Sequence, residues 1–163
     1  MDNQNNAAHS TANIYNPLIE AAKPVFILVN AMQQTTSQLS TDSLINKFSL
    51  LINNFEENAE KNGARYDAIQ AAKYCLCTFV DELAVRAGWA DETWSKNSLL
   101  VSFYDETWGG ERFFEIIQNL KQDPDKNIDL LEFMYLCLQF GYKGKYQVLN
   151  SGELEIDKIK RDL

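Results

Sequence analysis

The segment from residue 65 to residue 87 constrains the fold more than any other, because it has a helical pattern with apolar side chains on nearly every face. A helix that is apolar all round has to be covered by other elements. We therefore expect it to be the central and most buried helix. Its apolar residues are Ile69, Ala72, Leu76, Val80, Leu83 and Ala87 on one stripe and Tyr74, Cys75, Cys77, Phe79 and Val85 on the other faces.

Other helical patterns before and after this segment supply the cover. Asn16-Pro17 is a typical helix start, with Asn as the cap and Pro at the first helical position. Pro24 should kink that helix or delay its start. Asn62-Gly63 and Gly141 are expected to end helices. The expected helices run from 17 to about 32, from 41 or 42 to about 62, from 91 through 104, from about 111 to 123, and from 129 to 141.

The remaining segments complete the prediction of an all-α protein. Asp129 and Glu132 have the spacing of a capping box at the start of the last core helix. The tail should be irregular and then form a short charged helix from about Glu153, and residues 146–149 carry a weak strand signal. We expect residues 15–163 to form a single compact domain of about six to eight helices, without a linker between domains.

Composition narrows the class of protein. The chain has 163 residues, of which 45% are hydrophobic, and a formal net charge of -8. It is therefore long and apolar enough to bury a core, and its negative charge makes it unsuited to bind nucleic acid or anionic lipid.

Cys75, Cys77 and Cys137 are an odd number of cysteines in apolar runs, which is typical of buried free thiols in a reducing compartment. Residues 1–14 lack the apolar core of a signal peptide and are expected to form a flexible head. No run reaches the ~20 apolar residues of a membrane span, so we expect a soluble, cytoplasmic chain.

The chain lacks the side chains that most enzyme classes need. Cys75 and Cys77 point about 200° apart on a helix, so they cannot hold one metal ion. The one histidine, His9, lies in the polar head, where nothing apolar would hold it as a base. Residues 141–145 are too short for a phosphate loop and lack its Ser or Thr. We expect no catalytic activity, no metal and no cofactor.

Asp81 and Glu82 are adjacent carboxylates inside the most apolar helix. Burying an unpaired charge costs several kcal/mol, and side chains about 100° apart must face different neighbours. Glu82 has Arg86 one turn ahead as an ion-pair partner. Asp81 has no cation at helical spacing, so it caps another helix, meets a distant cation or lines a wet groove. An acid/base pair is a further alternative, because perturbed carboxylates gather at functional sites.

A corner at residues 106–111 (ETWGGE) joins two helical patterns. Paired glycines indicate unusual dihedral angles or a close approach of the backbone. We expect Trp108 to pack as a wedge and, with Gly109 and Gly110, to set the angle between two helices. Glu111 should lie in the first turn of the next helix, where the helix dipole favours a carboxylate. Glu106 lacks such an evident structural role.

In combination these features resemble the DotU/IcmH/TssL family. The similarity covers about residues 15–163 and its motifs occur in the expected order. The opening Asn16-Pro17-Leu18 fits as well. The runs that carry the resemblance are residues 74–82 (YCLCTFVDE), 106–114 (ETWGGERFF) and 141–146 (GYKGKY).

The resemblance implies the cytoplasmic domain of an inner-membrane component of the type VI secretion system, built from two small stacked helical bundles. Family members are non-enzymatic scaffolds that pair with the IcmF/TssM membrane protein and dock baseplate components, including TssK; self-association is a further expectation. Asp81 and Glu82 match the family's acidic motif and, with Glu106 and Glu111, are the expected partner-binding residues. The family's C-terminal membrane anchor is absent here, and Gln147 stands where relatives often carry a basic residue.

Two other functions compete with the scaffold. A small helical domain that uses the same carboxylates for ligand binding or catalysis predicts a closed apolar pocket with convergent polar groups, whereas a scaffold predicts an open groove. A free-standing cytoplasmic regulator is the third hypothesis.

Overall fold

The computed structural model describes residues 15–34 and 39–163. Within these ranges the chain forms helices and no strand, so the all-α prediction is confirmed, and no helix there has both the length and the apolar character to cross a bilayer. The predicted head, residues 1–14, lies outside the described residues. The helices are α1 (Pro17–Gln34), α2 (Thr41–Lys61), α3 (Tyr66–Arg86), α4 (Glu92–Lys96), α5 (Leu99–Tyr104), α6 (Arg112–Leu120), α7 (Ile128–Gln139), the 3₁₀ helix η1 (Gly144–Val148) and α8 (Gly152–Asp162).

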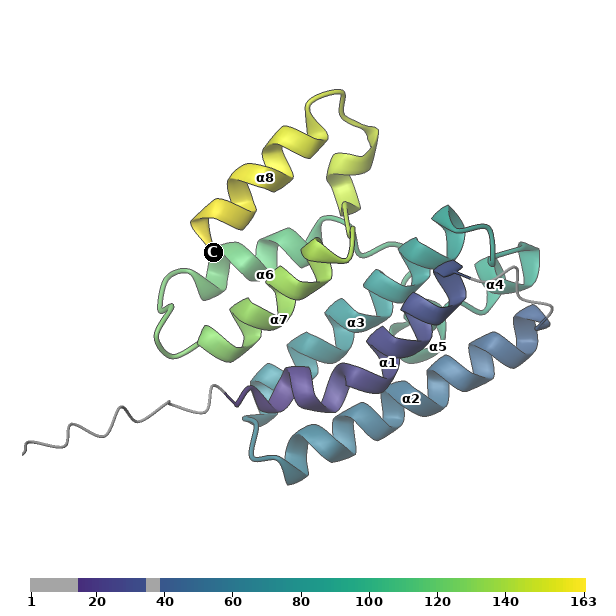
Figure 1. Ribbon diagram of the computed structural model, residues 1–163, viewed down its shortest axis with the longest axis horizontal. Helices are drawn as coiled ribbons and strands as arrows, with labels where there is room; N and C mark the ends of the chain where they lie inside the picture. Colours follow the sequence, from purple (N-terminus) through teal and green to yellow (C-terminus); the bar gives the residue numbers. More distant parts are fainter. Residues whose placement is uncertain (1–14, 35–38) are drawn as a thin grey trace, which may run out of the picture.

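The helices form two stacked bundles, as expected (Figure 1). The first bundle holds α1, α2 and α3, and the short helices α4 and α5 pack against α2 and α3. The second bundle holds α6, α7 and α8, and η1 packs against α8. Because α3 contacts both α6 and α7, and α1 also contacts α7, these two helices, α3 and α1, join the two bundles.

The burial of α3 confirms that it is the central helix. Every residue from Tyr74 to Val80 is buried, and a helix covered on only one face would not show such a run. Burying one large apolar side chain contributes about 1.5–3 kcal/mol, so α3 is the main source of apolar stabilisation. Cys75 and Cys77 lie in this run, and with Cys137 of α7 they are buried free thiols, as predicted.

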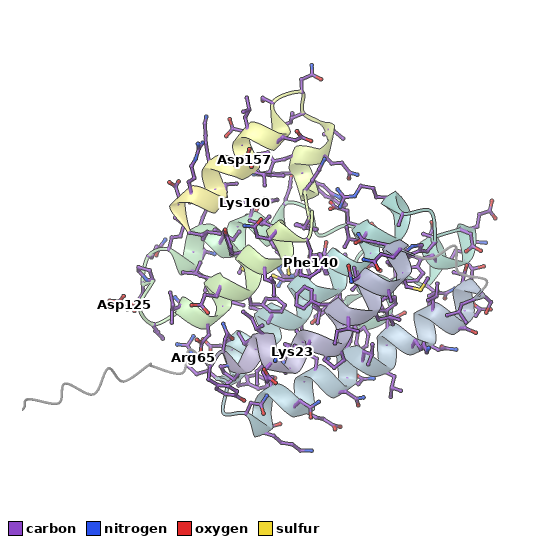
Figure 2. All side chains as sticks on the ribbon, viewed as in Figure 1. Lys23, Arg65, Asp125, Phe140, Asp157 and Lys160 are labelled. Carbon is purple, nitrogen blue, oxygen red and sulfur yellow. The ribbon has the colours of Figure 1, made fainter. Side chains whose placement is uncertain are left out.

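Aromatic rings hold the first bundle against α7. The Phe26 ring of α1 lies with its centroid 5.4 Å from that of Phe79, 6.1 Å from that of Phe133 and 5.0 Å from that of Phe140. Phe140 directly follows α7 and lies between α7 and α1 in Figure 2. Ring pairs of this kind add about 0.5–1.5 kcal/mol beyond their buried area.

Asn16 fixes the start of α1 and ties it to α7. Its Oδ1 accepts hydrogen bonds from the backbone N–H groups of Leu18 (3.0 Å) and Ile19 (3.2 Å), which confirms the predicted cap. Its Nδ2 donates to the backbone oxygen of Asp129 (2.9 Å) and to Glu132 Oε2 (3.0 Å). The predicted capping box is therefore wrong, because Asp129 lies inside α7 and Glu132 binds Asn16 instead.

Two local expectations fail for identifiable reasons, and one of the two alternatives at Pro24 does not occur. The helix predicted over residues 91–104 is two helices, because Asn97 leaves helical geometry (φ −128°, ψ 30°) and the Ser98 side chain caps α5. The strand signal at residues 146–149 is wrong, since η1 covers most of this segment. Pro24 does not delay α1, which continues through it.

Candidate functional site

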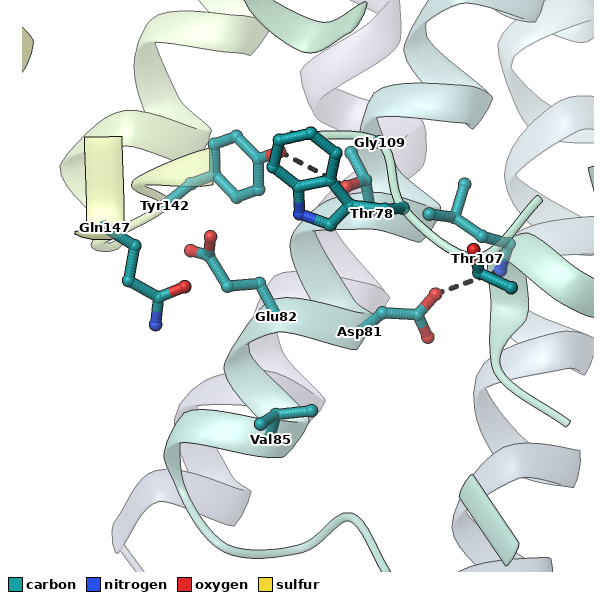
Figure 3. A pocket seen from close by; sticks show the side chains of 10 residues that line it. Thr78, Asp81, Glu82, Val85, Thr107, Gly109, Tyr142 and Gln147 are labelled. Carbon is teal, nitrogen blue, oxygen red and sulfur yellow. Dashed lines mark hydrogen bonds between the residues drawn. The ribbon is translucent and has the colours of Figure 1, made fainter. Parts of the chain in front are cut away.

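A cleft opens where α3, the corner at residues 106–111 and the segment around η1 meet (Figure 3). Its volume is about 230 Å³. Because its walls come from α3 and from segments before and after the second bundle's core helices, the cleft lies at the junction of the two bundles. The lining residues are Thr78, Asp81, Glu82, Val85, Leu100, Thr107, Trp108, Gly109, Tyr142 and Gln147.

Asp81 caps the N-terminus of α5. Its Oδ1 accepts hydrogen bonds from the Leu99 backbone N–H (2.9 Å) and the Trp94 indole N–H (3.1 Å), and its Oδ2 accepts one from the Leu100 N–H (2.9 Å). The break before α5 leaves these backbone N–H groups without partners inside the helix. Burial raises the pKa of Asp81 to about 6, even though the N–H donors favour the charged form. Asp81 thus both caps a helix and lines the cleft.

Glu82 holds the turn between α7 and η1. Its Oε1 accepts a hydrogen bond from the Gly144 N–H (2.6 Å), and its Oε2 accepts one from the Lys143 N–H (2.8 Å). Arg86 Nη2 lies 3.3 Å from Oε2, which confirms the ion pair predicted one turn ahead. Burial raises the pKa of Glu82 despite these donors. The two neighbouring carboxylates therefore bind different parts of the fold, as their angular separation requires.

The paired glycines are needed for close approach and not for unusual dihedral angles. A Cβ on Gly109 would lie 2.8 Å from Thr78 Oγ1, and one on Gly110 would lie 2.5 Å from a ring carbon of Trp108. The Gly110 carbonyl accepts a hydrogen bond from the Lys145 N–H (3.1 Å). At Gly144 (φ +52°) a Cβ would lie 2.8 Å from this same carbonyl oxygen. The corner and the η1 segment thus meet backbone to backbone.

Trp108 does not pack as the expected wedge. Its side chain is 57% exposed and forms part of the cleft wall. The close contacts at the corner are made by Gly109 and Gly110, which leaves the indole outside the core. The angle between the helices is therefore fixed by the glycine contacts, and the Trp108 ring is available at the surface.

Glu106 and Glu111 are absent from the lining of the cleft. Glu106 accepts hydrogen bonds from the Tyr74 hydroxyl (2.7 Å) and from Arg112 Nη1 (3.0 Å). The Arg112 guanidinium also lies 4.4 Å from the centroid of the Tyr74 ring, so this group forms a polar brace beside the corner. Burial and the nearby Glu106 carboxylate raise the pKa of Tyr74. Glu111 is exposed at the cap position, one residue before α6, and its side chain makes no capping hydrogen bond.

Sequence reasoning missed several residues of the cleft. Thr78 and Tyr142 come from distant segments, and their hydroxyl groups lie 3.2 Å apart in the interior. Val85, Thr107 and Gln147 contribute exposed side chains. Thr78, Thr107 and Tyr142 lie in runs that carry the resemblance and Gln147 follows one of them, but the sequence did not single out Thr78, Thr107 or Tyr142 as site residues. They are brought together by the contact of the corner with the η1 segment, which no local pattern specifies.

The chemistry of the cleft suits recognition. Its side chains are carboxylates, hydroxyls, an amide, an indole and aliphatic groups, without a basic residue. Burial raises the pKa of Cys75, Cys77 and Cys137, so these thiols are poor nucleophiles. The rim carries the exposed side chains of Val85 and Trp108, so the cleft opens to solvent and is not fully enclosed.

Comparison with known proteins gives one family. A family model described as "Type VI secretion system protein DotU" matches residues 17–163. TssL from Vibrio cholerae is 33% identical with a TM-score of 0.77, and the match covers 90% of this chain and 92% of that one. The cytoplasmic domain of TssL from Acinetobacter baumannii is 25% identical with a TM-score of 0.80, covering 90% and 96%. No curated protein sequence matches the chain.

A third structure, SciP/TssL from Escherichia coli Enteroaggregative 042, is 20% identical with a TM-score of 0.75, covers 90% of this chain and 85% of that one, and shows the same fold. DotU and TssL proteins are structural inner-membrane components of the type VI secretion system and are not enzymes. The match over nearly the whole described chain confirms the resemblance in the sequence. This chain belongs to the DotU family of type VI secretion system proteins.

Proposed function

We propose that this chain is a scaffold whose cleft docks a cytoplasmic component of the secretion machine, with a TssK-type baseplate protein as the expected partner. The observation that carries the proposal is the open acidic cleft between the two bundles, with exposed Val85 and Trp108 on its rim. A groove with an apolar anchor point and a polar surround is typical of protein recognition.

The location of the proposed scaffold follows from its family. The chain aligns with the cytoplasmic domain of a TssL protein, so we place it on the cytoplasmic side of the bacterial inner membrane. There we expect it to pair with an IcmF/TssM-type membrane protein. Self-association of two copies of this chain is compatible with this arrangement.

Three of the carboxylates predicted to bind partners also make hydrogen bonds within the fold. Asp81 and Glu82 line the cleft and give it negative charge, but both also hold backbone N–H groups of the fold. Substituting them alters stability and docking together. Glu106 is occupied by Tyr74 and Arg112, which makes it a support of the corner. A direct test must therefore use the exposed rim.

Val85→Glu is the sharpest test of docking. Val85 is 64% exposed on the rim, and Leu50 on α2, away from the cleft, is 61% exposed and serves as the matched control. The Val85→Glu substitution replaces an apolar contact with a carboxylate that loses water when the partner binds, at a cost of about 2 kcal/mol or more, so we expect capture of the TssK-type protein to fall by about 30-fold or more. Leu50→Glu should capture normally. Equal capture by the two variants, at equal melting temperature, would contradict the proposal.

A further inference from the structure

The cleft carries negative charge that the described residues only partly neutralise. The three donors to Asp81 are two backbone N–H groups and an indole N–H, all of them uncharged. Glu82 has two cationic neighbours, Arg86, which forms an ion pair with it, and Lys143. None of the lining residues is basic. A cation that enters the cleft therefore meets an uncompensated carboxylate in a partly desolvated site, where charge interactions are stronger than in water.

Both carboxylates retain capacity to accept another hydrogen bond. A carboxylate offers about four acceptor positions. Asp81 Oδ2 accepts a single bond, from the Leu100 N–H, and Glu82 Oε1 accepts a single bond, from the Gly144 N–H. Each carboxylate accepts three in total. These free acceptor positions favour a bound group that carries several N–H donors.

Trp108 adds a flat aromatic surface to the same cleft. Its side chain is 57% exposed and belongs to the lining, while Gly110 leaves room for the ring. Among the aromatic side chains, the indole of Trp attracts cations to its face most strongly. Carboxylates and an accessible indole in one cleft are thus complementary to a group that is planar, cationic and rich in donors.

We infer that the cleft receives an arginine side chain of the protein partner, whose guanidinium is attracted by the Asp81 and Glu82 carboxylates and stacks on Trp108. This inference rests on the proposed docking function of the cleft and names the chemistry of the group that enters it. Arginine fits better than lysine because its planar fork presents five donors and stacks on aromatic rings, whereas an ammonium is a compact and strongly hydrated charge.

Titration of the isotopically labelled chain with N-acetyl-arginine amide tests the inference, followed by NMR of the Leu100 and Gly144 amides and the Trp108 indole. We expect saturable shifts at these three groups, with a Kd on the order of millimolar for so small a ligand. The lysine analogue should bind more weakly, and the neutral isostere N-acetyl-citrulline amide should not bind. Equal shifts with citrulline, equal affinity for lysine, or shifts elsewhere on the chain would overturn the assignment.

Trp108→Ala adds a matched comparison, because the side chain is exposed and the fold should persist. We expect arginine binding to weaken about tenfold with the loss of the cation–π contact. Tyr66→Ala is the control, since Tyr66 is 77% exposed on another part of α3, and it should leave binding unchanged. Equal arginine affinity in the two variants would also contradict the inference.

The arginine site and the docking role of the cleft can be disproved independently. If Val85→Glu abolishes capture of the partner while arginine does not bind, the cleft docks a protein through another chemistry and the arginine assignment is wrong. If arginine binds as expected while Val85→Glu captures the partner normally, the cation site exists and the proposed docking role is wrong.

Discussion

The two junctions that α3 makes with the elements around it are held together by different forces. Towards α1 and α7 the contact is a cluster of aromatic rings around Phe26 and Phe79. Towards the η1 segment and α5 it consists of the Asp81 and Glu82 carboxylates, each bound to backbone N–H groups. The first junction is closed, and the second contains the cleft.

This difference explains why the cleft lies where it does. Apolar packing excludes water and is spread over many weak contacts, so it leaves no groove. Carboxylates that cap backbone groups hold two segments at a distance and keep polar atoms near solvent. The second junction therefore has a fixed geometry and polar groups that a partner can reach. Its stability depends on a few hydrogen bonds.

Phe79→Ala should have the largest effect, because the ring is fully buried and packs against Phe26 and Phe140. We expect the free energy of unfolding to fall by about 3–5 kcal/mol, from lost burial and the cavity left behind. Urea unfolding followed by circular dichroism measures it. The exposed Leu50→Ala should change stability by less than about 0.5 kcal/mol. A similar small loss for Phe79→Ala would show that the aromatic junction contributes little.

Asp81→Ala should come next, because it removes the acceptor of three N–H groups. Leaving a buried donor unsatisfied costs about 1–3 kcal/mol, so we expect a total loss of about 2–4 kcal/mol and faster amide exchange at Leu99 and Leu100. Glu111→Ala, at an exposed carboxylate without a capping bond, is the control and should be near neutral. A neutral Asp81→Ala would remove the structural role of this residue.

Gly109→Ala should destabilise the corner by overpacking. The added Cβ would lie 2.8 Å from Thr78 Oγ1 and 3.0 Å from the Tyr74 hydroxyl, and forced repacking costs about 1–3 kcal/mol. Thermal unfolding measures the loss, and Thr107→Ala at the exposed neighbouring position should leave the melting temperature unchanged. A stable Gly109→Ala would mean that the corner can yield without affecting α3.

The smallest expected effect is a pH dependence. Asp81 has a pKa raised to about 6 from 3.8, so between these values the folded chain binds more protons than the unfolded chain. Its contribution to stability therefore rises as pH falls from 7 towards 4, by about 1 kcal/mol between pH 7 and pH 5. The difference in unfolding free energy between the unaltered chain and Asp81→Asn isolates this group, since other carboxylates cancel. A difference independent of pH would contradict the raised pKa.

The sequence predicted the regions held by apolar packing. The all-round apolar pattern of α3 indicated its central place, and Asn16-Pro17 indicated the start of α1. In both cases a residue's own neighbours in the chain determine the structure. The acidic pair was also found, because two adjacent carboxylates in such a helix need partners.

What the sequence did not predict depends on contacts between distant segments. The end of α4 at Asn97 is favoured by Asp81, which binds the N–H groups of the next helix. Trp108 is exposed, while the next two residues, Gly109 and Gly110, make the close contacts of the corner with distant segments. The pairing of Thr78 with Tyr142 spans two bundles. No periodicity or cap signal contains this information.

The most direct test of the account measures the free energy of unfolding and capture of the TssK-type partner together, for Asp81→Lys and Val85→Glu. We expect Asp81→Lys to lose both stability and capture, because Asp81 supports the fold and gives the cleft negative charge. Val85→Glu should lose capture alone. The result would contradict a structural role of Asp81 if Asp81→Lys keeps its stability. It would contradict a docking role of the rim residue Val85 if Val85→Glu captures the partner as well as Leu50→Glu does.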